Sequence, residues 1–190
     1  WSSDVCSSDL AHYHFGSKDA LIEAVSAYRL ARVNLRRMER LAAVESRGAP
    51  TLRDLMEVMV LPMVEEMEQT AGGANYIQVL AQLSGHPAHD LAKLVRSRNA
   101  EALQRCSKIA ASLVPEIPQR VFEMRFGLSI LTAISALANR ERMLSSPLTD
   151  EKVEMPMLVS VLVDSLEASL RAPLSASTRA ELQLGTKQRA

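Results

Sequence analysis

The amino-acid sequence predicts an all-α protein, and three observations support this fold class. Apolar residues recur at steps of three and four over long segments, which is the spacing of one face of an α-helix. No segment shows the alternation of apolar and polar residues that a half-buried strand requires. The 190 residues include only 7 glycines and 8 prolines, too few for the turns that an all-β fold needs about every 8–12 residues.

The composition allows a large core but gives no global charge signal. Hydrophobic residues make up 47% of the chain and aromatic residues only 4%, so the core must consist mainly of aliphatic side chains and the 9 methionines. Basic and acidic residues balance at 22 each. Any contact with nucleic acid must therefore come from a local patch.

The sequence predicts a soluble cytoplasmic protein without metal or cofactor. Cys6 and Cys106 lie far apart without metal-ligand spacing, which favours two unpaired thiols in a reducing cytosol. No apolar run approaches the roughly 18 residues of a membrane span. The first residues also lack the basic start and apolar stretch of a signal peptide.

Residues 1–10 are expected to lie outside the fold. They read WSSDVCSSDL, repeat Ser-Ser-Asp, and have neither helical nor strand periodicity. We interpret this segment as sequence foreign to the protein. The alternative is a natural, disordered, serine-rich leader.

The first predicted helix runs from Ser17 to about Glu45. Ser17 is a good N-cap, and Asp19 in the first turn suits the helix dipole. At 1.5 Å per residue this helix is roughly 40 Å long, a connecting rod rather than a core element.

A second helix is predicted from Thr51 to about Gln69. Thr51 and Asp54 have the spacing of a capping box, and Pro62 is expected to kink the helix. Further helices follow at about 76–83, 88–113 and 119–143. The last begins near Met155, because Pro156 suits the first turn of a helix, and runs to about residue 172. The tail at 173–190 is rich in Ser, Thr, Gln and Ala and is predicted to be disordered.

One short motif gives a family resemblance. Residues 11–22 read AHYHFGSKDALI. This segment resembles the end of the TetR-family helix-turn-helix and the start of the helix after it. The residues that match the family pattern are Tyr13, His14, Phe15, Gly16, Ser17, Lys18 and Leu21. The family more often has Tyr or Asn at the position of His12, so no DNA contact is assigned to His12.

The resemblance implies a ligand-responsive transcriptional regulator, a repressor that binds operator DNA as a homodimer. It makes residues 11–45 the end of the DNA-binding headpiece with the connecting helix, and residues 46–172 the ligand-binding and dimerisation domain. Two helices and most of the recognition helix are expected before residue 11, so the base-reading residues, and with them the operator, are not predicted. The expected phosphate contacts are Tyr13, His14, Ser17 and Lys18, because a helix N-terminus with a lysine attracts anions.

The resemblance also implies a pocket for a small effector among the helices between Ser17 and Leu137. Flexible methionines suit a cavity that accepts an apolar ligand, although they equally suit a plain core. Few ionisable groups interrupt these apolar faces, so a mainly apolar effector is expected. The predicted lining residues are Met56, Met59, Met63, Tyr76, Gln78, Gln82 and Phe126.

The last two long helices are expected to pair with their copies in a second chain. The helix after Met155 has an apolar band too wide for a surface helix, and its partner carries small residues that allow close packing. The predicted interface residues are Gly127, Ile130, Ile134, Leu158, Leu162 and Leu166.

Other patterns have simpler interpretations. The first helix carries a run of five arginines: Arg29, Arg32, Arg36, Arg37 and Arg40. This run is interpreted as a solvated face with Glu39 and Glu45 rather than a further DNA contact, and residues 86–90 (HPAHD) as a surface turn rather than a metal site. Cys106 could sense redox state but has no second cysteine as a partner. The rival functions are a dimeric helical binding module that does not bind DNA, and an enzyme, for which the sequence offers no nucleophile–base pair, metal cluster or phosphate loop.

Overall fold

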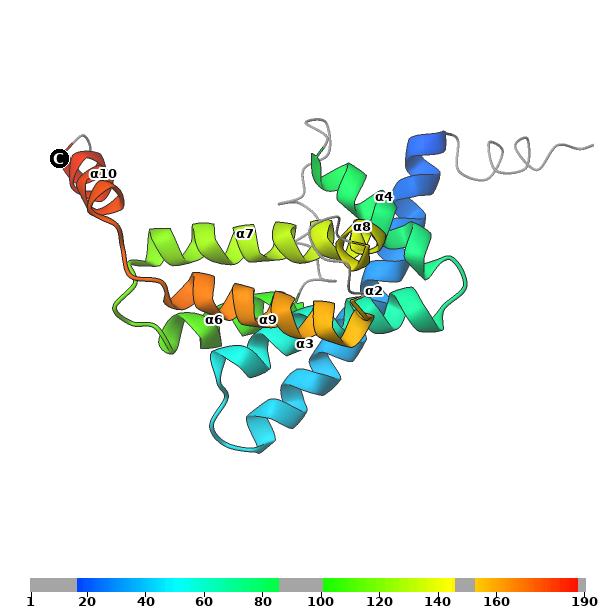
Figure 1. Ribbon diagram of the computed structural model, residues 1–190, viewed down its shortest axis with the longest axis horizontal. Coiled ribbons are helices and arrows are strands. Elements are labelled where there is room, and N and C mark those ends of the chain that lie inside the picture. Colours follow the sequence, from blue (N-terminus) through cyan, green and yellow to red (C-terminus); the bar gives the residue numbers. More distant parts are fainter. Residues whose placement is uncertain (1–16, 86–100, 146–152, 188–190) are drawn as a thin grey trace, which may run out of the picture.

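The computed structural model describes residues 17–85, 101–145 and 153–187, and these ranges contain eight helices and no strand (Figure 1). The predicted all-α class is confirmed. The helices are α2 (Lys18–Ser46), α3 (Leu52–Gln69), α4 (Gly73–Gly85), α6 (Glu101–Ser112), α7 (Gln119–Ala138), α8 (Arg140–Leu144), α9 (Met155–Arg171) and α10 (Ala176–Lys187).

The predicted caps of the first two helices are confirmed. The Ser17 side chain accepts a hydrogen bond from the Ala20 N–H at 3.1 Å. The Thr51 side chain accepts from the Asp54 N–H, while the Asp54 carboxylate accepts from the Thr51 N–H at 2.9 Å. Each cap satisfies N–H groups that a helix start leaves without partners.

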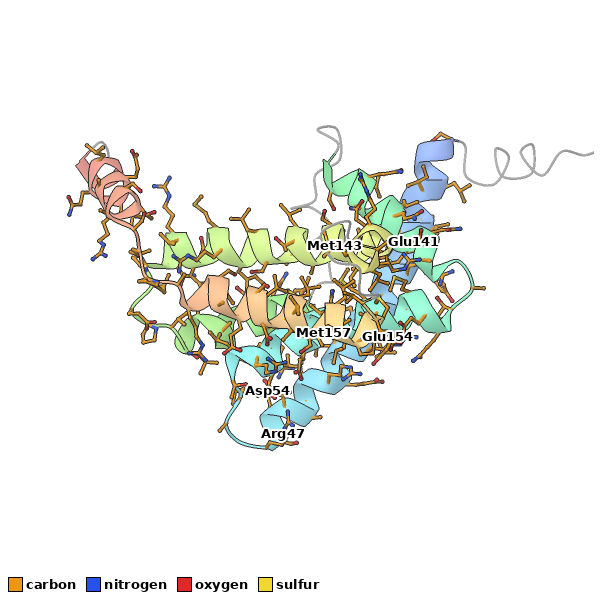
Figure 2. All side chains as sticks on the ribbon, viewed as in Figure 1. Arg47, Asp54, Glu141, Met143, Glu154 and Met157 are labelled. Atoms are coloured by element: carbon orange, nitrogen blue, oxygen red, sulfur yellow. The ribbon has the colours of Figure 1, made fainter. Side chains whose placement is uncertain are left out.

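The breaks on either side of α3 depend on glycine. Gly48 and Gly72 have φ angles of 85° and 73°, which other residues rarely adopt. A Cβ atom at Gly73 would collide with the backbone oxygen of Glu66. Arg47 and Asp54 close the loop before α3 with a 2.9 Å ion pair, which Figure 2 shows at one corner of the molecule.

Three boundaries differ from the predictions. The helix predicted at 76–83 begins earlier, at Gly73, and ends at Gly85. The helix predicted at 119–143 is divided at Asn139, whose side-chain amide donates to the Ser135 oxygen, so α7 ends and the short α8 follows. The helix predicted at 88–113 is described only from Glu101, because residues 86–100 lie outside the described ranges.

The prediction of a disordered tail after Pro173 does not agree with the structure, which has α10 at Ala176–Lys187. The Ser175 hydroxyl accepts from the Thr178 N–H at 3.2 Å and so caps this helix. In Figure 1, α10 projects away from the other helices.

The core surrounds α3, which packs against α2, α4, α6, α7 and α9. Both faces of α3 are buried, and the helix continues through the buried Pro62. α7 and α9 lie side by side and run in opposite directions (Figure 1). Arg125 of α7 joins them further by donating to the Ala172 oxygen at 2.6 Å, beyond the end of α9.

Candidate functional site

The arginines of α2 converge on a carboxylate of α3. Glu66 has a fully buried side chain and accepts from Arg29 at 2.6 Å and from Arg36 at 2.8 Å. Arg32 lies 3.5 Å from the same carboxylate, and the Thr70 hydroxyl donates to it at 3.0 Å. We call this set, Glu66 with Arg29, Arg32, Arg36 and Thr70, the Glu66 cluster.

The cluster keeps Glu66 ionised. Burial alone raises the pKa of a carboxyl group, but the hydrogen bonds from Arg29, Thr70 and Arg36 outweigh burial, so the pKa of Glu66 lies below its ordinary value of 4.5. A neighbouring pair, Arg40 with Glu65, adds a second link between α2 and α3.

The interpretation of the arginine run as a solvated face is therefore wrong. Four of its five members bond to carboxylates of α3, because α3 crosses α2 along the side that carries them. Sequence periodicity identifies a buried helix face by its apolar residues. It therefore misses a face on which arginines are covered by the acidic residues of another helix.

Arg37, the remaining arginine of the run, points instead into the core. It is only 3% exposed, and its Nε and Nη2 both donate to the backbone oxygen of Met59, at 3.2 and 2.9 Å. No carboxylate of the described residues forms an ion pair with it. Burial lowers the pKa of Arg37 to about 10.

Two weak acids face this guanidinium from other helices. Burial raises the pKa of Tyr76 on α4 to about 12 and the pKa of Cys106 on α6 to about 11, and in both cases the charge of Arg37 opposes the rise. The thiol of Cys106 is thus protonated at neutral pH, which argues against the redox-sensing interpretation.

The predicted pocket residues divide into two groups. One group is buried and belongs to a single core cluster: Met56, Met59, Met63, Tyr76 and Phe126. The helix of Arg37, α2, also contributes side chains to this cluster. Gln78 and Gln82 are exposed on the outer side of α4 and do not point into this core. Neither of the two cavities described below includes any of these seven residues.

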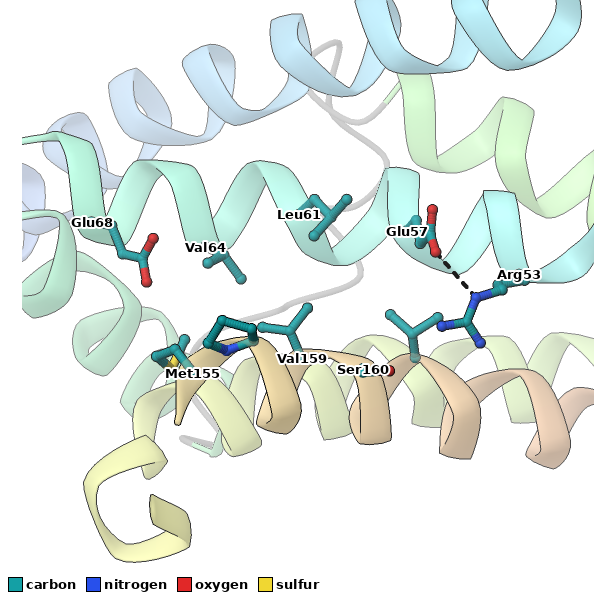
Figure 3. Close-up of a pocket in the computed structure, with 10 residues that line it drawn as sticks. Arg53, Glu57, Leu61, Val64, Glu68, Met155, Val159 and Ser160 are labelled. Atoms are coloured by element: carbon teal, nitrogen blue, oxygen red, sulfur yellow. Dashed lines mark hydrogen bonds and ion pairs between the residues drawn. The ribbon is translucent and has the colours of Figure 1, made fainter. Parts of the chain in front are cut away.

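An open groove of about 390 Å³ runs between α3 and α9 (Figure 3). Its walls are mainly apolar, with the pair Arg53–Glu57 at one end and Glu68 at the other. Arg53 also pairs with Asp164 and so ties the two helices together. The apolar lining residues are Leu61, Val64, Met155, Pro156, Val159 and Val163. A smaller cavity lies at the loop between α2 and α3.

Half of the six predicted interface residues lie on the inner side of the α7–α9 pair. Ile134, Leu162 and Leu166 are buried within the chain, so they are not free to contact a partner. Gly127, Ile130 and Leu158 are partly exposed.

The outer side of this pair carries a different apolar set, one helical position away. These side chains are 38–63% exposed, and we call them the outer face: Met124, Leu128, Leu131, Met157 and Val161. The sequence did not reveal that Ile134, Leu162 and Leu166 are covered within the chain, since both sides of α9 are apolar and only the position of its neighbours decides which one is covered.

The predicted DNA contacts fall at or before the start of α2. Tyr13 and His14 lie outside the described residues, as do residues 86–90. Ser17 caps α2 and is exposed, and Lys18 is the first residue of the helix. Within the described ranges, no group of three or more metal-ligating side chains occurs.

One helix of the described residues, α7, is long and apolar enough to cross a membrane by length and composition alone. Core helices of soluble proteins pass the same test, and 44% of the α7 window is buried inside the chain.

The arrangement is that of an all-α domain with a charged contact between α2 and α3 and with exposed apolar side chains on α7 and α9. The family model described as "Tetracyclin repressor-like, C-terminal domain" matches residues 57–169, more than half of the chain. The chain therefore belongs to the TetR family of regulators, as the motif at residues 11–22 predicted. No curated protein and no solved structure matches it.

Proposed function

We propose that this protein is a ligand-responsive transcriptional regulator that represses its target genes and binds operator DNA as a homodimer. The observation that carries the proposal is the match to the TetR-type C-terminal domain over α3 to α9. In this role the protein works in the cytoplasm and has no enzymatic activity.

The outer face supports the homodimer. Five large apolar side chains on two adjacent helices form the kind of exposed patch that marks a protein–protein interface. A two-fold axis through this face would bring α7 and α9 against their copies in a four-helix arrangement.

The Glu66 cluster supports a route from effector to DNA. α2 begins at the predicted DNA-contacting residues, and its arginines hold it against α3. An effector in the core between α2, α3, α4, α6 and α7 would favour a different position of α2. Two headpieces carried by α2 would then no longer match successive major grooves, which lie about 34–36 Å apart.

The test is a selection of genomic DNA fragments by the full-length protein. Selection from genomic DNA fragments should enrich one sequence, and Lys18→Ala should weaken binding to all sequences alike and reduce the salt slope by about one. A change of base preference without a change of salt dependence would contradict the role of Lys18.

The same experiment separates the rival. A full-length protein that forms dimers but binds no DNA fragment would be the binding module without DNA-binding activity. For the effector, a thermal-shift screen should give hits among mainly apolar compounds. Stabilisation by polyanionic compounds only would contradict an apolar effector.

A further inference from the structure

The side chain that the proposed function leaves unexplained is Arg37. The chain offers carboxylates to the other arginines of α2, and Glu65 and Glu66 on α3 pair with four of them. Arg37 alone is turned inward, where it is 3% exposed and has no carboxylate partner among the described residues. A buried cation without a counter-ion is costly, and binding of an anion would offset this cost.

The hydrogen bonds of Arg37 to the described residues use only one edge of the guanidinium. Nε and Nη2 converge on a single acceptor, the Met59 oxygen. A guanidinium has five N–H groups, and the Nη1 atom donates to none of the described residues. The edge formed by Nη1 and Nη2 is the one that binds a carboxylate with two parallel hydrogen bonds.

The surroundings of this edge are apolar, with one further donor. Arg37 lies where α2, α3, α4 and α6 meet, near buried Val33, Met59 and Cys106. The buried Tyr76 faces it from α4, and its hydroxyl donates to none of the described residues. A carboxylate at Arg37 could therefore accept from Tyr76 as well.

We propose that Arg37 is the anchor for the acid group of the effector, which is a monocarboxylate with an apolar body. The proposal rests on the ligand-responsive function proposed above and names the polar end of that ligand. One negative charge neutralises Arg37, and the apolar body lies against the methionines and aliphatic residues of the same core cluster. A polyanion would bring charges that no described residue of this core could pair.

The test uses two probes of equal chain length, decanoate and decan-1-ol, and measures their dissociation constants by calorimetry at neutral pH. The full chain should bind decanoate about tenfold or more tightly than decan-1-ol, the ratio expected when hydrogen bonds to a charged group are gained. Arg37→Met should remove this preference by weakening decanoate and leaving decan-1-ol unchanged. Arg37→Lys should keep part of it, and Tyr76→Phe should reduce it by a smaller factor.

Arg40→Met is the matched control, because it removes the same charge from the same helix at a partly exposed residue that pairs with Glu65. It should leave the preference for decanoate intact. Circular dichroism and a urea midpoint show whether Arg37→Met folds, and Arg37→Lys keeps the test decisive if it does not.

Equal binding of the acid and the alcohol to the parent chain would overturn the anchor while leaving a ligand-binding domain. Loss of both probes in equal measure in Arg37→Met would also overturn it, since Arg37 would then serve only to hold the Met59 oxygen. Binding of neither probe to any variant would overturn the anchor, and the DNA experiment above would still decide the regulatory function independently.

Discussion

The contact between α2 and α3 and the pair α7–α9 reverse the usual distribution of side chains. At the first, charged groups are covered: Glu66 is fully buried under the arginines of α2. At the second, large apolar groups such as Leu128 and Val161 are left exposed. Buried charges fix a geometry because their partners must stay in place, whereas an exposed apolar face gains free energy only when something covers it. The first region is thus complete within one chain, whereas the second leaves apolar surface that the proposed dimer would cover.

The largest expected effect is on the free energy of unfolding, and it distinguishes the inner side of α9 from its outer side. Leu162→Asp places an unpaired charge in the core and should lower the free energy of unfolding by about 4 kcal/mol or more. Val161→Asp, one residue earlier on the exposed side, should cost less than about 1 kcal/mol in the single chain but weaken the dimer. Urea unfolding and sedimentation measure the two effects. A fully folded, monomeric Leu162→Asp variant would show that the two sides have been exchanged.

The next effect concerns the Glu66 cluster. Glu66→Ala leaves three arginines without their carboxylate, and since these arginines still reach water, the expected loss of unfolding free energy is about 3 kcal/mol. The matched control is Glu68→Ala, an exposed glutamate on the same helix, which should change stability by less than about 0.5 kcal/mol. Equal effects in urea unfolding would mean that the cluster contributes no more than a surface charge.

Acid should weaken the Glu66 cluster before it affects the outer face. The pKa of Glu66 in the folded chain lies below 4.5, so its contribution to stability is complete above that value and is lost as the pH falls from 4.5 through the folded pKa. The urea midpoint of the parent chain should therefore drop more steeply between pH 5 and pH 3 than that of Glu66→Gln. Parallel curves for the two proteins would contradict the assignment.

The smallest effect tests Gly127 on α7. A Cβ atom there meets nothing within 4 Å, so Gly127→Ala should stabilise the single chain by about 0.5–1 kcal/mol through helix propensity. Gly127→Leu should weaken the dimer if a second copy packs closely on this position. An unchanged dimer constant in sedimentation would place Gly127 outside the interface and confine the contact to the larger side chains of the outer face.

The sequence by itself determined the helices and their starts. Ser17, Thr51 with Asp54, and Pro156 act within a few residues, so the bounds of α2, α3 and α9 follow from local chemistry. The motif at residues 11–22 likewise indicated the family without any knowledge of packing. Local signals failed where a short-range competitor was overlooked, as with the Asn139 side chain that ends α7 and the Ser175 cap that begins α10.

Only the tertiary structure decided which side of each helix is covered. The sequence predicted solvated arginines on α2, but α3 places Glu65 and Glu66 against them. The sequence also predicted Leu162 as an interface residue, but it is buried within the chain, where α9 packs against α3 and α7. The groove between α3 and α9 joins residues as far apart in sequence as Leu61 and Val159. Whether a side chain is buried depends on which other helix packs against it. The spacing of residues along one helix does not show which helix that is.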